Sequence, residues 1–173
     1  MKTIKAAPSQ HTRPLLGLRR RPGRLALAVF RLPLVLYRRG WGRLLGHTFM
    51  LLVHAGRKTG QPHPMTAMVM RYDPTSREVI IFAGWGPNSD WVRNIRARPA
   101  LRVEVGREWY TPQHRFLSDD ESVAVASDFL RSHPYRVLLA SRILDWPDLH
   151  SQAALRDFVR THPFVALRPA DAA

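Results

Sequence analysis

Short apolar runs separated by turn residues dominate the chain from residue 47 onward, and this pattern predicts strands more often than helices. Residues 101–105 (LRVEV) alternate apolar and charged side chains, which is typical of a strand with one face in solvent. Asp73-Pro74-Thr75-Ser76 is a turn signal between two such runs. About six strands are predicted, over His47–Ala55, His63–Tyr72, Glu78–Ala83, Leu101–Val105, Trp109–Phe116 and Pro163–Arg168.

Turn and capping residues connect these strands to each other and to helices. Gly106-Arg107 suits a two-residue hairpin. Ser118 and Glu121 form a capping box at the start of a helix that runs to about Leu130, and residues 134–160 are predicted to continue as helix, broken near Pro147. The sequence therefore predicts an α+β fold, mainly antiparallel β, with a small barrel rather than a doubly wound sheet.

The N-terminal part has a different pattern. Residues 1–23 combine prolines, glycines and arginines and predict a flexible basic leader. Residues 24–39 (RLALAVFRLPLVLYRR) are apolar apart from arginines seven positions apart, which indicates an amphipathic helix within residues 24–46. This run is too short, and too interrupted by Arg31 and Pro33, to span a membrane. It suits a membrane interface, although a helix packed on its own domain would show the same pattern.

The positive charge is concentrated in the first part of the chain. The formal net charge is +14, and residues 1–72 hold 14 of the 27 lysines and arginines and none of the 13 acidic residues. The remaining 13 basic and 13 acidic residues cancel, which favours an anionic membrane surface over nucleic acid as the partner of this segment. The chain has no cysteine and its histidines are scattered singly, so no metal site is predicted.

The turn HAGRKTGQPH, residues 54–63, is the first candidate binding element. Gly56 and Gly60 permit a tight turn whose backbone N–H groups converge near Thr59. Arg57 and Lys58 add a bidentate fork and a point charge, and His63 can supply a third donor, a combination suited to phosphate or carboxylate. The alternative is that this is a hairpin tip with solvated cations.

A second candidate element is the stretch VIIFAGWGPNSDWVRNIRARP, residues 79–99. An apolar strand leads through Gly84-Trp85-Gly86 to a short helix that Asn88 or Ser89 can cap. Trp85 and Trp91 could wall an aromatic cofactor, or could simply complete the core. Together, the two elements favour an anionic ligand that carries a ring system.

These residues resemble the deazaflavin-dependent nitroreductase family, whose members use coenzyme F420 on a split β-barrel of the FMN-binding type. The resemblance covers residues 47–169 and leaves 170–173 as a tail. It implies transfer of a hydride from the reduced deazaflavin to an organic acceptor, a lipid-soluble quinone or a nitro compound. It rests on residues 56–62 (GRKTGQP), Gly84-x-Gly86, Trp91-x-x-Asn94-x-x-Ala97-x-Pro99 and Val103-x-Val105.

The same resemblance implies roles for individual residues. His133 or Tyr135 would donate a proton or lie in the substrate pocket, and Met68 would contact substrate with Tyr135. The chain departs from the quinone-reducing branch in having His63 for an arginine, Gly84 and Trp85 for a serine and a lysine, and Met68 for a tyrosine. The cofactor would be held by Arg57, Lys58, Thr59, Gly60, His63, Pro64, Met65, Ala83, Gly84, Trp85, Gly86, Trp91 and Asn94.

Other functions remain open from the sequence. The barrel could bind FMN or haem instead of the deazaflavin, and the basic N-terminus could serve a non-catalytic membrane-bound scaffold or a nucleic-acid-binding module. The preferred interpretation is a cytoplasmic enzyme without a nucleic-acid partner, peripheral on the inner face of the cell membrane through residues 24–39. Homodimerisation is left open.

Overall fold

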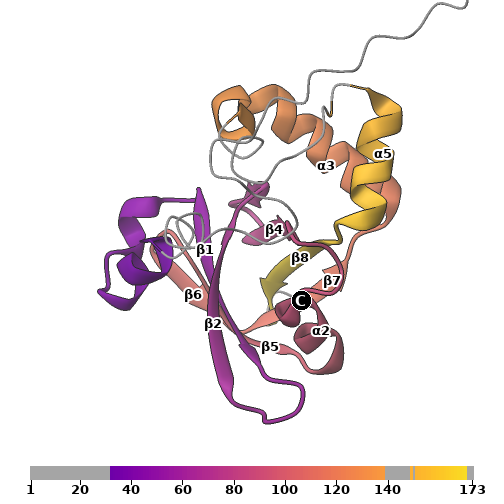
Figure 1. Cartoon of the computed structure of the whole chain (residues 1–173). Coiled ribbons are helices and arrows are strands. Elements are labelled where there is room, and N and C mark those ends of the chain that lie inside the picture. Colours follow the sequence, from indigo (N-terminus) through magenta and orange to yellow (C-terminus); the bar gives the residue numbers. More distant parts are fainter. Residues whose placement is uncertain (1–31, 139–148, 150, 171–173) are drawn as a thin grey trace, which may run out of the picture.

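The computed structural model describes residues 32–138, 149 and 151–170 and shows two antiparallel sheets with helices packed outside them (Figure 1). The predicted α+β class with antiparallel sheets is confirmed. The leader, the first part of the N-terminal helix, the predicted break near Pro147 and residues 171–173 lie outside the described residues.

The first sheet has the strand order β2-β1-β5-β6 and the second has the order β3-β4-β8-β7. The predicted hairpin at Gly106-Arg107 is confirmed, because Val105 pairs with Glu108 across it. In the second sheet the last strand, β8, lies between β4 and β7. The strands are β1 (Phe49–Ala55), β2 (Pro62–Met68), β3 (Arg71–Asp73), β4 (Glu78–Phe82), β5 (Ala100–Val105), β6 (Glu108–Tyr110), β7 (Pro112–Phe116) and β8 (Phe164–Pro169).

The prediction of six strands is wrong at two places, where a single predicted strand divides between the sheets. Residues 63–72 form β2 in the first sheet and β3 in the second, with buried Val69 and Met70 at the corner. Residues 109–116 divide in the same way at Thr111, before β7 begins at Pro112. Both runs look continuous in sequence because a chain that turns a corner between packed sheets stays extended.

The inner core lies between the two sheets and is closed at one end by helix α2 (Asp90–Ala97). Alternate residues of the central strands point inward, among them Leu52, Val79, Val103 and Val165, which are fully buried. Trp91, Val92 and Ile95 of α2 pack against them. The core therefore holds the start of α2 in a defined position beside the β1–β2 turn.

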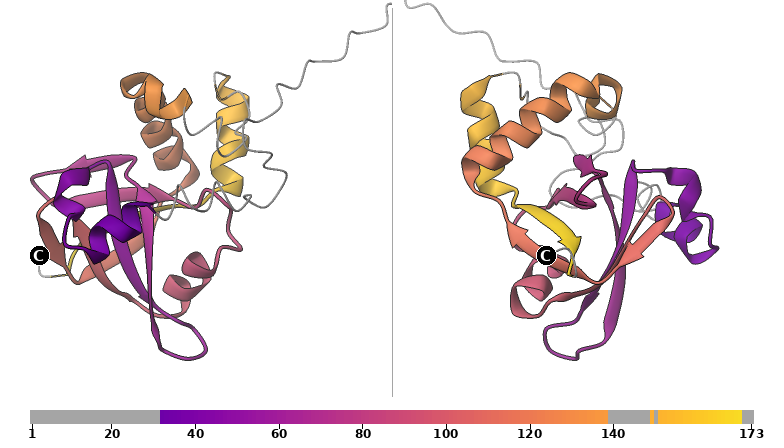
Figure 2. Two further views of the ribbon diagram at one scale, coloured as in Figure 1. Left: turned by 60° about the vertical axis from the view of Figure 1, so that its left-hand side comes forward. Right: turned by 180° about the vertical axis from the view of Figure 1, so that it is seen from behind.

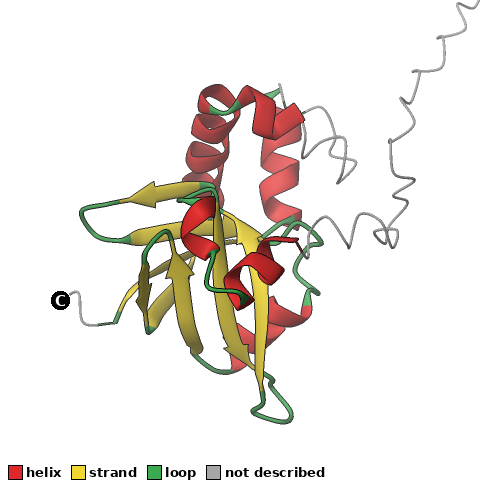
Figure 3. Ribbon diagram, turned by 90° about the vertical axis from the view of Figure 1, so that its left-hand side faces the viewer, coloured by secondary structure: helices red, strands yellow, loops and turns green. Residues whose placement is uncertain are grey.

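A second core covers the other face of the β3-β4-β8-β7 sheet. Helices α3 (Asp119–Ser132) and α5 (Gln152–Thr161) pack there through side chains that include Phe129 and Phe158. The predicted capping box of α3 is confirmed, since the Ser118 hydroxyl accepts from the Glu121 N–H and the Glu121 carboxylate accepts from the Ser118 N–H. Because both faces of this sheet are covered, β4 and β8 are almost continuously buried. Figures 2 and 3 show these helices at the end of the molecule opposite the β1–β2 turn.

The last part of the predicted N-terminal helix lies within the described residues. Residues 32–38 are helical, and Gly40, at φ 72°, closes the helix because the N–H groups of Gly40 and Trp41 donate to the carbonyls of Tyr37 and Leu36. A separate 3₁₀ turn, η1 (Gly42–Leu45), follows. Tyr37 is buried and donates to the Phe49 carbonyl oxygen at 2.9 Å, so this side of the helix packs on β1. No helix among the described residues is long and apolar enough to cross a membrane.

Candidate functional site

A cleft of about 400 Å³ lies between the β1–β2 turn and helix α2. Its wall combines cationic, imidazole, amide and carboxylate side chains. Gly56, Arg57, Lys58 and Thr59 line it from the turn, His54 and His63 from the flanking strands, and Asp90 and Asn94 from α2.

The turn has the tight geometry that its glycines predict. The Gly60 N–H donates to the Gly56 carbonyl at 2.7 Å, and the Gly56 N–H donates to the Gln61 carbonyl at 2.8 Å. Gly60 has a φ of 70°, in the left-handed region that favours glycine. A Cβ on Gly56 would lie 2.8 Å from the Thr59 hydroxyl oxygen and 3.0 Å from His63 Nε2. Gly56 is therefore required by the close approach of side chains from both sides of the turn.

Asn94 joins the turn to α2. Its Oδ1 accepts from the Arg57 backbone N–H and from Arg57 Nη1, each at 3.1 Å. Its Nδ2 lies 3.0 Å from Nδ1 of His54 on β1. His54 and Asn94 are 5% and 4% exposed, so these are buried polar groups that are hydrogen-bonded. The position of Arg57 in the cleft thus depends on a residue 37 positions away.

The cleft carries more positive than negative charge. Arg57 Nη1 also donates to Asp90 Oδ1 at 3.0 Å, and this hydrogen bond holds the pKa of the Asp90 carboxyl below its usual value. Lys58 is exposed and has no ion-pair partner among the described residues. Burial lowers the pKa of His54 to about 4, with His63 acting in the same direction and Asp90 opposing it. At neutral pH the cleft therefore carries the positive charges of Arg57 and Lys58, the negative charge of Asp90 and an uncharged His54.

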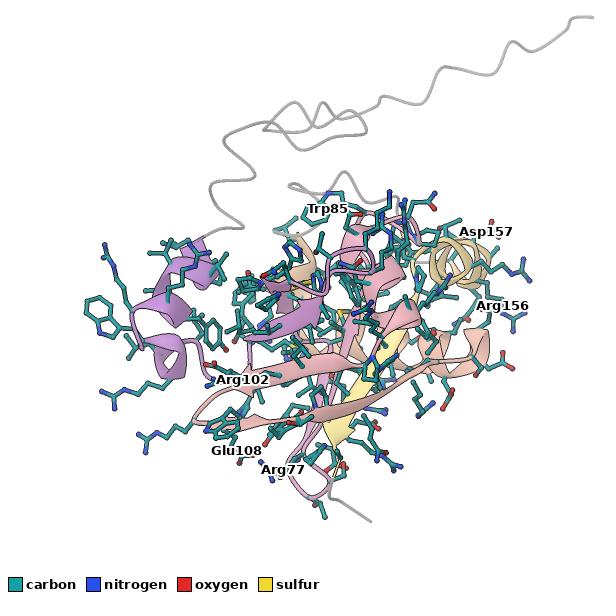
Figure 4. All side chains as sticks on the ribbon, turned by 90° about the horizontal axis from the view of Figure 1, so that it is seen from below. Arg77, Trp85, Arg102, Glu108, Arg156 and Asp157 are labelled. Atoms are coloured by element: carbon teal, nitrogen blue, oxygen red, sulfur yellow. The ribbon has the colours of Figure 1, made fainter. Side chains whose placement is uncertain are left out.

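The predicted second loop packs against the barrel beside the end of α5. Ala83 donates to the Pro163 carbonyl at 2.9 Å, and a Cβ on Gly86 would lie 3.3 Å from the Thr161 carbonyl oxygen. Trp85 projects at the surface and is 49% exposed (Figure 4). Trp91 is buried in the inner core, which favours the interpretation that it completes the core. The two tryptophans therefore have different environments.

The helix after this loop begins where predicted, but its capping differs. Ser89 is at the N-cap position of α2, yet its hydroxyl makes no cap hydrogen bond and donates to the Gly86 carbonyl at 2.8 Å. Ser89 therefore closes the glycine turn, since its hydroxyl and its N–H both donate to the Gly86 carbonyl. The Asp90 carboxylate lies in that first turn, where it compensates the helix dipole.

The remaining predicted residues lie outside the cleft. Pro64, Met65 and Met68 follow one another along β2, with Met65 and Met68 partly buried against the two cores. His133 ends α3 with its ring stacked on Phe129, at 4.9 Å between centroids, and Tyr135 is 86% exposed. The segment that bears His133 and Tyr135 lies at the helical end of the molecule, whereas the β1–β2 turn lies at the other end (Figure 1).

No role is predicted for His54 or Asp90 from the sequence, although a signal is present for each. A turn between two antiparallel strands places His54 opposite His63, and the two rings are 5.8 Å apart. Asp90 and Asn94 are four residues apart on a helix and therefore share a face. Their proximity to Arg57 could not be inferred, because it depends on how α2 packs against β1.

Comparison with known proteins identifies relatives of this chain. A model of the family described as F420H(2)-dependent quinone reductase matches residues 30–135, which is more than half of the chain. The solved structure of an F420-H2 dependent reductase (FDR-A) is 16% identical with a TM-score of 0.49, and the match covers 72% of this chain and 96% of that chain.

Two further solved structures are similar. A protein of unknown function from Agrobacterium tumefaciens is 13% identical with a TM-score of 0.50, and the match covers 80% of this chain and 55% of that chain. The haem storage protein HutZ from Vibrio cholerae is 13% identical with a TM-score of 0.45, covering 79% of this chain and 91% of that chain. At these identities the likeness concerns the fold alone.

Proposed function

Because the chain belongs to the F420H(2)-dependent quinone reductase family, we propose that it is an oxidoreductase that transfers a hydride from reduced coenzyme F420 to an organic acceptor, a lipid-soluble quinone or a nitro compound. The two corner-joined sheets support the split-barrel class that the family resemblance implies. The observation that carries the proposal is the cleft at the β1–β2 turn, which presents Arg57 and Lys58 beside Gly56, where a Cβ would crowd the side chains of Thr59 and His63.

The cleft fits the anionic tail of this cofactor. Arg57 is held in place by Asn94 and Asp90, so its guanidinium loses little conformational freedom when an anion binds. Lys58 adds a mobile point charge and Thr59 lines the cleft, while Gly60 closes the turn through its hydrogen bond to Gly56. His63, on β2 beside the turn, is a further hydrogen-bonding group in the cleft. These residues would hold the phosphate and carboxylates of the tail.

Strand β2 offers a path from the turn toward the helical end of the molecule. Its seven residues extend over roughly 20 Å, and it is an edge strand with exposed Pro64 and partly buried Met65 and Met68. We place the ring system along this strand, toward the loop of Ala83, Gly84, Trp85 and Gly86. When bound, the reduced deazaflavin supplies the hydride, and the protein orients ring and acceptor.

The acceptor side of the site is assigned to the helical end. Tyr135 is exposed and carries a phenol that can donate a proton to a reduced acceptor. His133 lies two residues away, and its Nδ1 is buried without a hydrogen-bond partner within the described residues. We propose this pair as the substrate-contacting or proton-donating groups, with Met68 as an apolar contact for the acceptor.

The test is a fluorescence titration of the full-length protein with coenzyme F420, with FMN titrated in parallel. Wild type is compared with the double variant Arg57→Ala, Lys58→Ala and with the control Arg131→Ala, which removes an exposed arginine of α3 far from the cleft. We expect saturable deazaflavin binding that is weakened at least a hundredfold in the double variant and unchanged in the control.

Two results would contradict the proposal. A higher affinity for FMN than for F420 would favour the alternative that this protein binds FMN. Visible haem retained through purification would favour the alternative that it binds haem. If F420 binds, oxidation of F420H2 is then followed with a quinone and with a nitroaromatic compound. Absence of turnover with both acceptors would contradict the proposed reaction while leaving the binding site intact.

We also propose peripheral membrane binding through the N-terminal segment, which would bring the enzyme to a lipid-soluble acceptor. Residues 32–45 expose four large apolar side chains, Leu32, Val35, Trp41 and Leu44, at 40–72%. Exposed Arg38, Arg39 and Arg43 lie among them, and a basic apolar surface of this kind suits an anionic leaflet.

Membrane binding is tested by co-sedimentation with anionic and neutral vesicles at low and high salt. Binding to anionic vesicles should fall in the double variant Trp41→Ala, Leu44→Ala and persist in Leu101→Ala, which removes an exposed apolar side chain near the start of β5. Equal recovery of wild-type protein with and without anionic vesicles at low salt would overturn this part of the proposal.

A further inference from the structure

His54 occupies an unusual place for a polar residue, because it is 5% exposed near the end of β1, an inner strand of the first sheet. It pairs with His63 on β2 and with Ala100 on β5. The β1–β5 register shifts beside it, since Val53 pairs with Arg102 and Leu101 is left as an extra residue. A bulge of this kind changes the direction in which the neighbouring side chain points. Here the side chain of His54 meets the amide of Asn94.

The hydrogen bonds of Asn94 determine how this amide and the imidazole are oriented. Oδ1 of Asn94 accepts two hydrogen bonds from Arg57, so the other end of the amide, Nδ2, faces His54. Nδ2 is a donor only, and therefore Nδ1 of His54 must be the acceptor. An imidazole that accepts at Nδ1 is neutral and carries its proton on Nε2. A chain of directed hydrogen bonds thus runs from β1 through α2 to the turn.

We propose that His54 is a positioning residue of the cofactor site: acting through Asn94, it holds the backbone N–H and the guanidinium of Arg57 in the orientation that binds an anion. This inference rests on the proposed function for the identity of the ligand. The chain of hydrogen bonds from His54 through Asn94 to Arg57, which we call the relay, does not depend on the identity of the ligand.

A neutral acceptor is well suited to this position. A leucine would leave Nδ2 of Asn94 buried without an acceptor, and the amide could then rotate away from Arg57. A carboxylate would satisfy Nδ2 but would add a negative charge next to a site for an anion. The groups that face His54 are His63 across the strand pair and Asp90, Asn94 and Arg57 around the cleft. Neutral histidine keeps Asn94 fixed without opposing the ligand.

The test compares His54→Leu with His54→Asn in the full-length protein. The Oδ1 atom of asparagine branches from Cγ as Nδ1 of histidine does, so His54→Asn retains an acceptor whereas His54→Leu removes it. Residue-resolved hydrogen exchange of the Arg57 amide in the ligand-free protein reports the relay directly, with the buried amides of β4 and β8 as the reference for global opening. Affinity for F420 is measured on the same samples.

In His54→Leu we expect the Arg57 amide to exchange at least tenfold faster relative to the reference amides, and F420 to bind about tenfold more weakly. Both values should return toward wild type in His54→Asn. Equal exchange of Arg57 in all three proteins, or equal acceleration of the reference amides, would overturn the proposal. Because the exchange measurement needs no ligand, a wild-type protein that fails to bind F420 refutes the proposed function and leaves this test decisive.

A measurement on the unmodified protein tests the relay even if a variant does not fold. The side-chain ¹⁵N shifts of His54 distinguish the tautomers, and we expect a neutral ring protonated at Nε2 at pH 7. A ring protonated at Nδ1, or a charged ring, could not accept from Asn94 and would overturn the relay.

Discussion

One side-chain oxygen of Asn94 binds Arg57 twice, at its backbone N–H and at its guanidinium, each at 3.1 Å. The backbone contact holds the turn and the guanidinium contact points the charge into the cleft. A single amide on α2 therefore determines both where the turn lies and what it presents to a ligand.

Replacing Asp90 by asparagine is expected to strengthen anion binding. Asp90 puts a carboxylate into the cleft and engages Arg57 Nη1 at 3.0 Å, but Asn94 still holds Arg57 without it. We expect Asp90→Asn to bind F420 about threefold to tenfold more tightly at low salt, with the gain reduced at high salt because these charges are exposed. Asp128→Asn, which removes an exposed carboxylate of α3, is the control. Weaker binding in Asp90→Asn would show that Asp90 is needed to orient Arg57.

The Gly56→Ala variant tests the close packing of the turn. Its Cβ would meet Thr59 Oγ1 at 2.8 Å and His63 Nε2 at 3.0 Å, so the cleft wall must shift. We expect F420 affinity to fall at least tenfold, as measured by fluorescence titration. The double variant Gly56→Ala, Thr59→Ala removes one of the two contacts and should regain part of the loss. Wild-type affinity in Gly56→Ala would mean that the turn does not contact the ligand.

The free energy of unfolding should depend on pH through His54. Its folded-state pKa is about 4, below the ordinary 6.5, so the unfolded chain binds a proton in this range that the folded protein does not. This contribution is fully present above pH 6.5 and is lost as the pH falls toward 4, at about 1.4 kcal/mol per pH unit. Urea denaturation over this range measures the slope. Burial also lowers the pKa values of His114 and His162, so the comparison is with His54→Asn, whose curve should be flatter.

The capping box of α3 should contribute to stability without affecting the cleft. Ser118→Ala removes the acceptor of the Glu121 N–H and is expected to lower the free energy of unfolding by about 1 kcal/mol. F420 affinity should stay at the wild-type value, because α3 lies at the other end of the molecule (Figure 3). A loss of affinity in this variant would indicate that the helical end and the turn are coupled.

Local features of the fold could be predicted from the sequence. The hairpin at Gly106-Arg107, the capping box at Ser118 and the tight turn between Gly56 and Gly60 all depend on hydrogen bonds and backbone angles between residues close in the chain. The short-range order of residue types is enough to determine such features. The cations of the β1–β2 turn are evident from the sequence for the same reason.

The arrangement of these features was decided only by the tertiary structure. Strand β8 lies between β4 and β7, where both faces of the sheet are covered, and two extended runs divide between the sheets. No local sequence signal marks either arrangement. The contact between His54 and Asn94 spans 40 positions and exists because α2 packs against β1. The sequence by itself determined the turn that carries the charges. Long-range packing determined the buried hydrogen bonds that orient them, since such bonds form only between groups that the fold brings together.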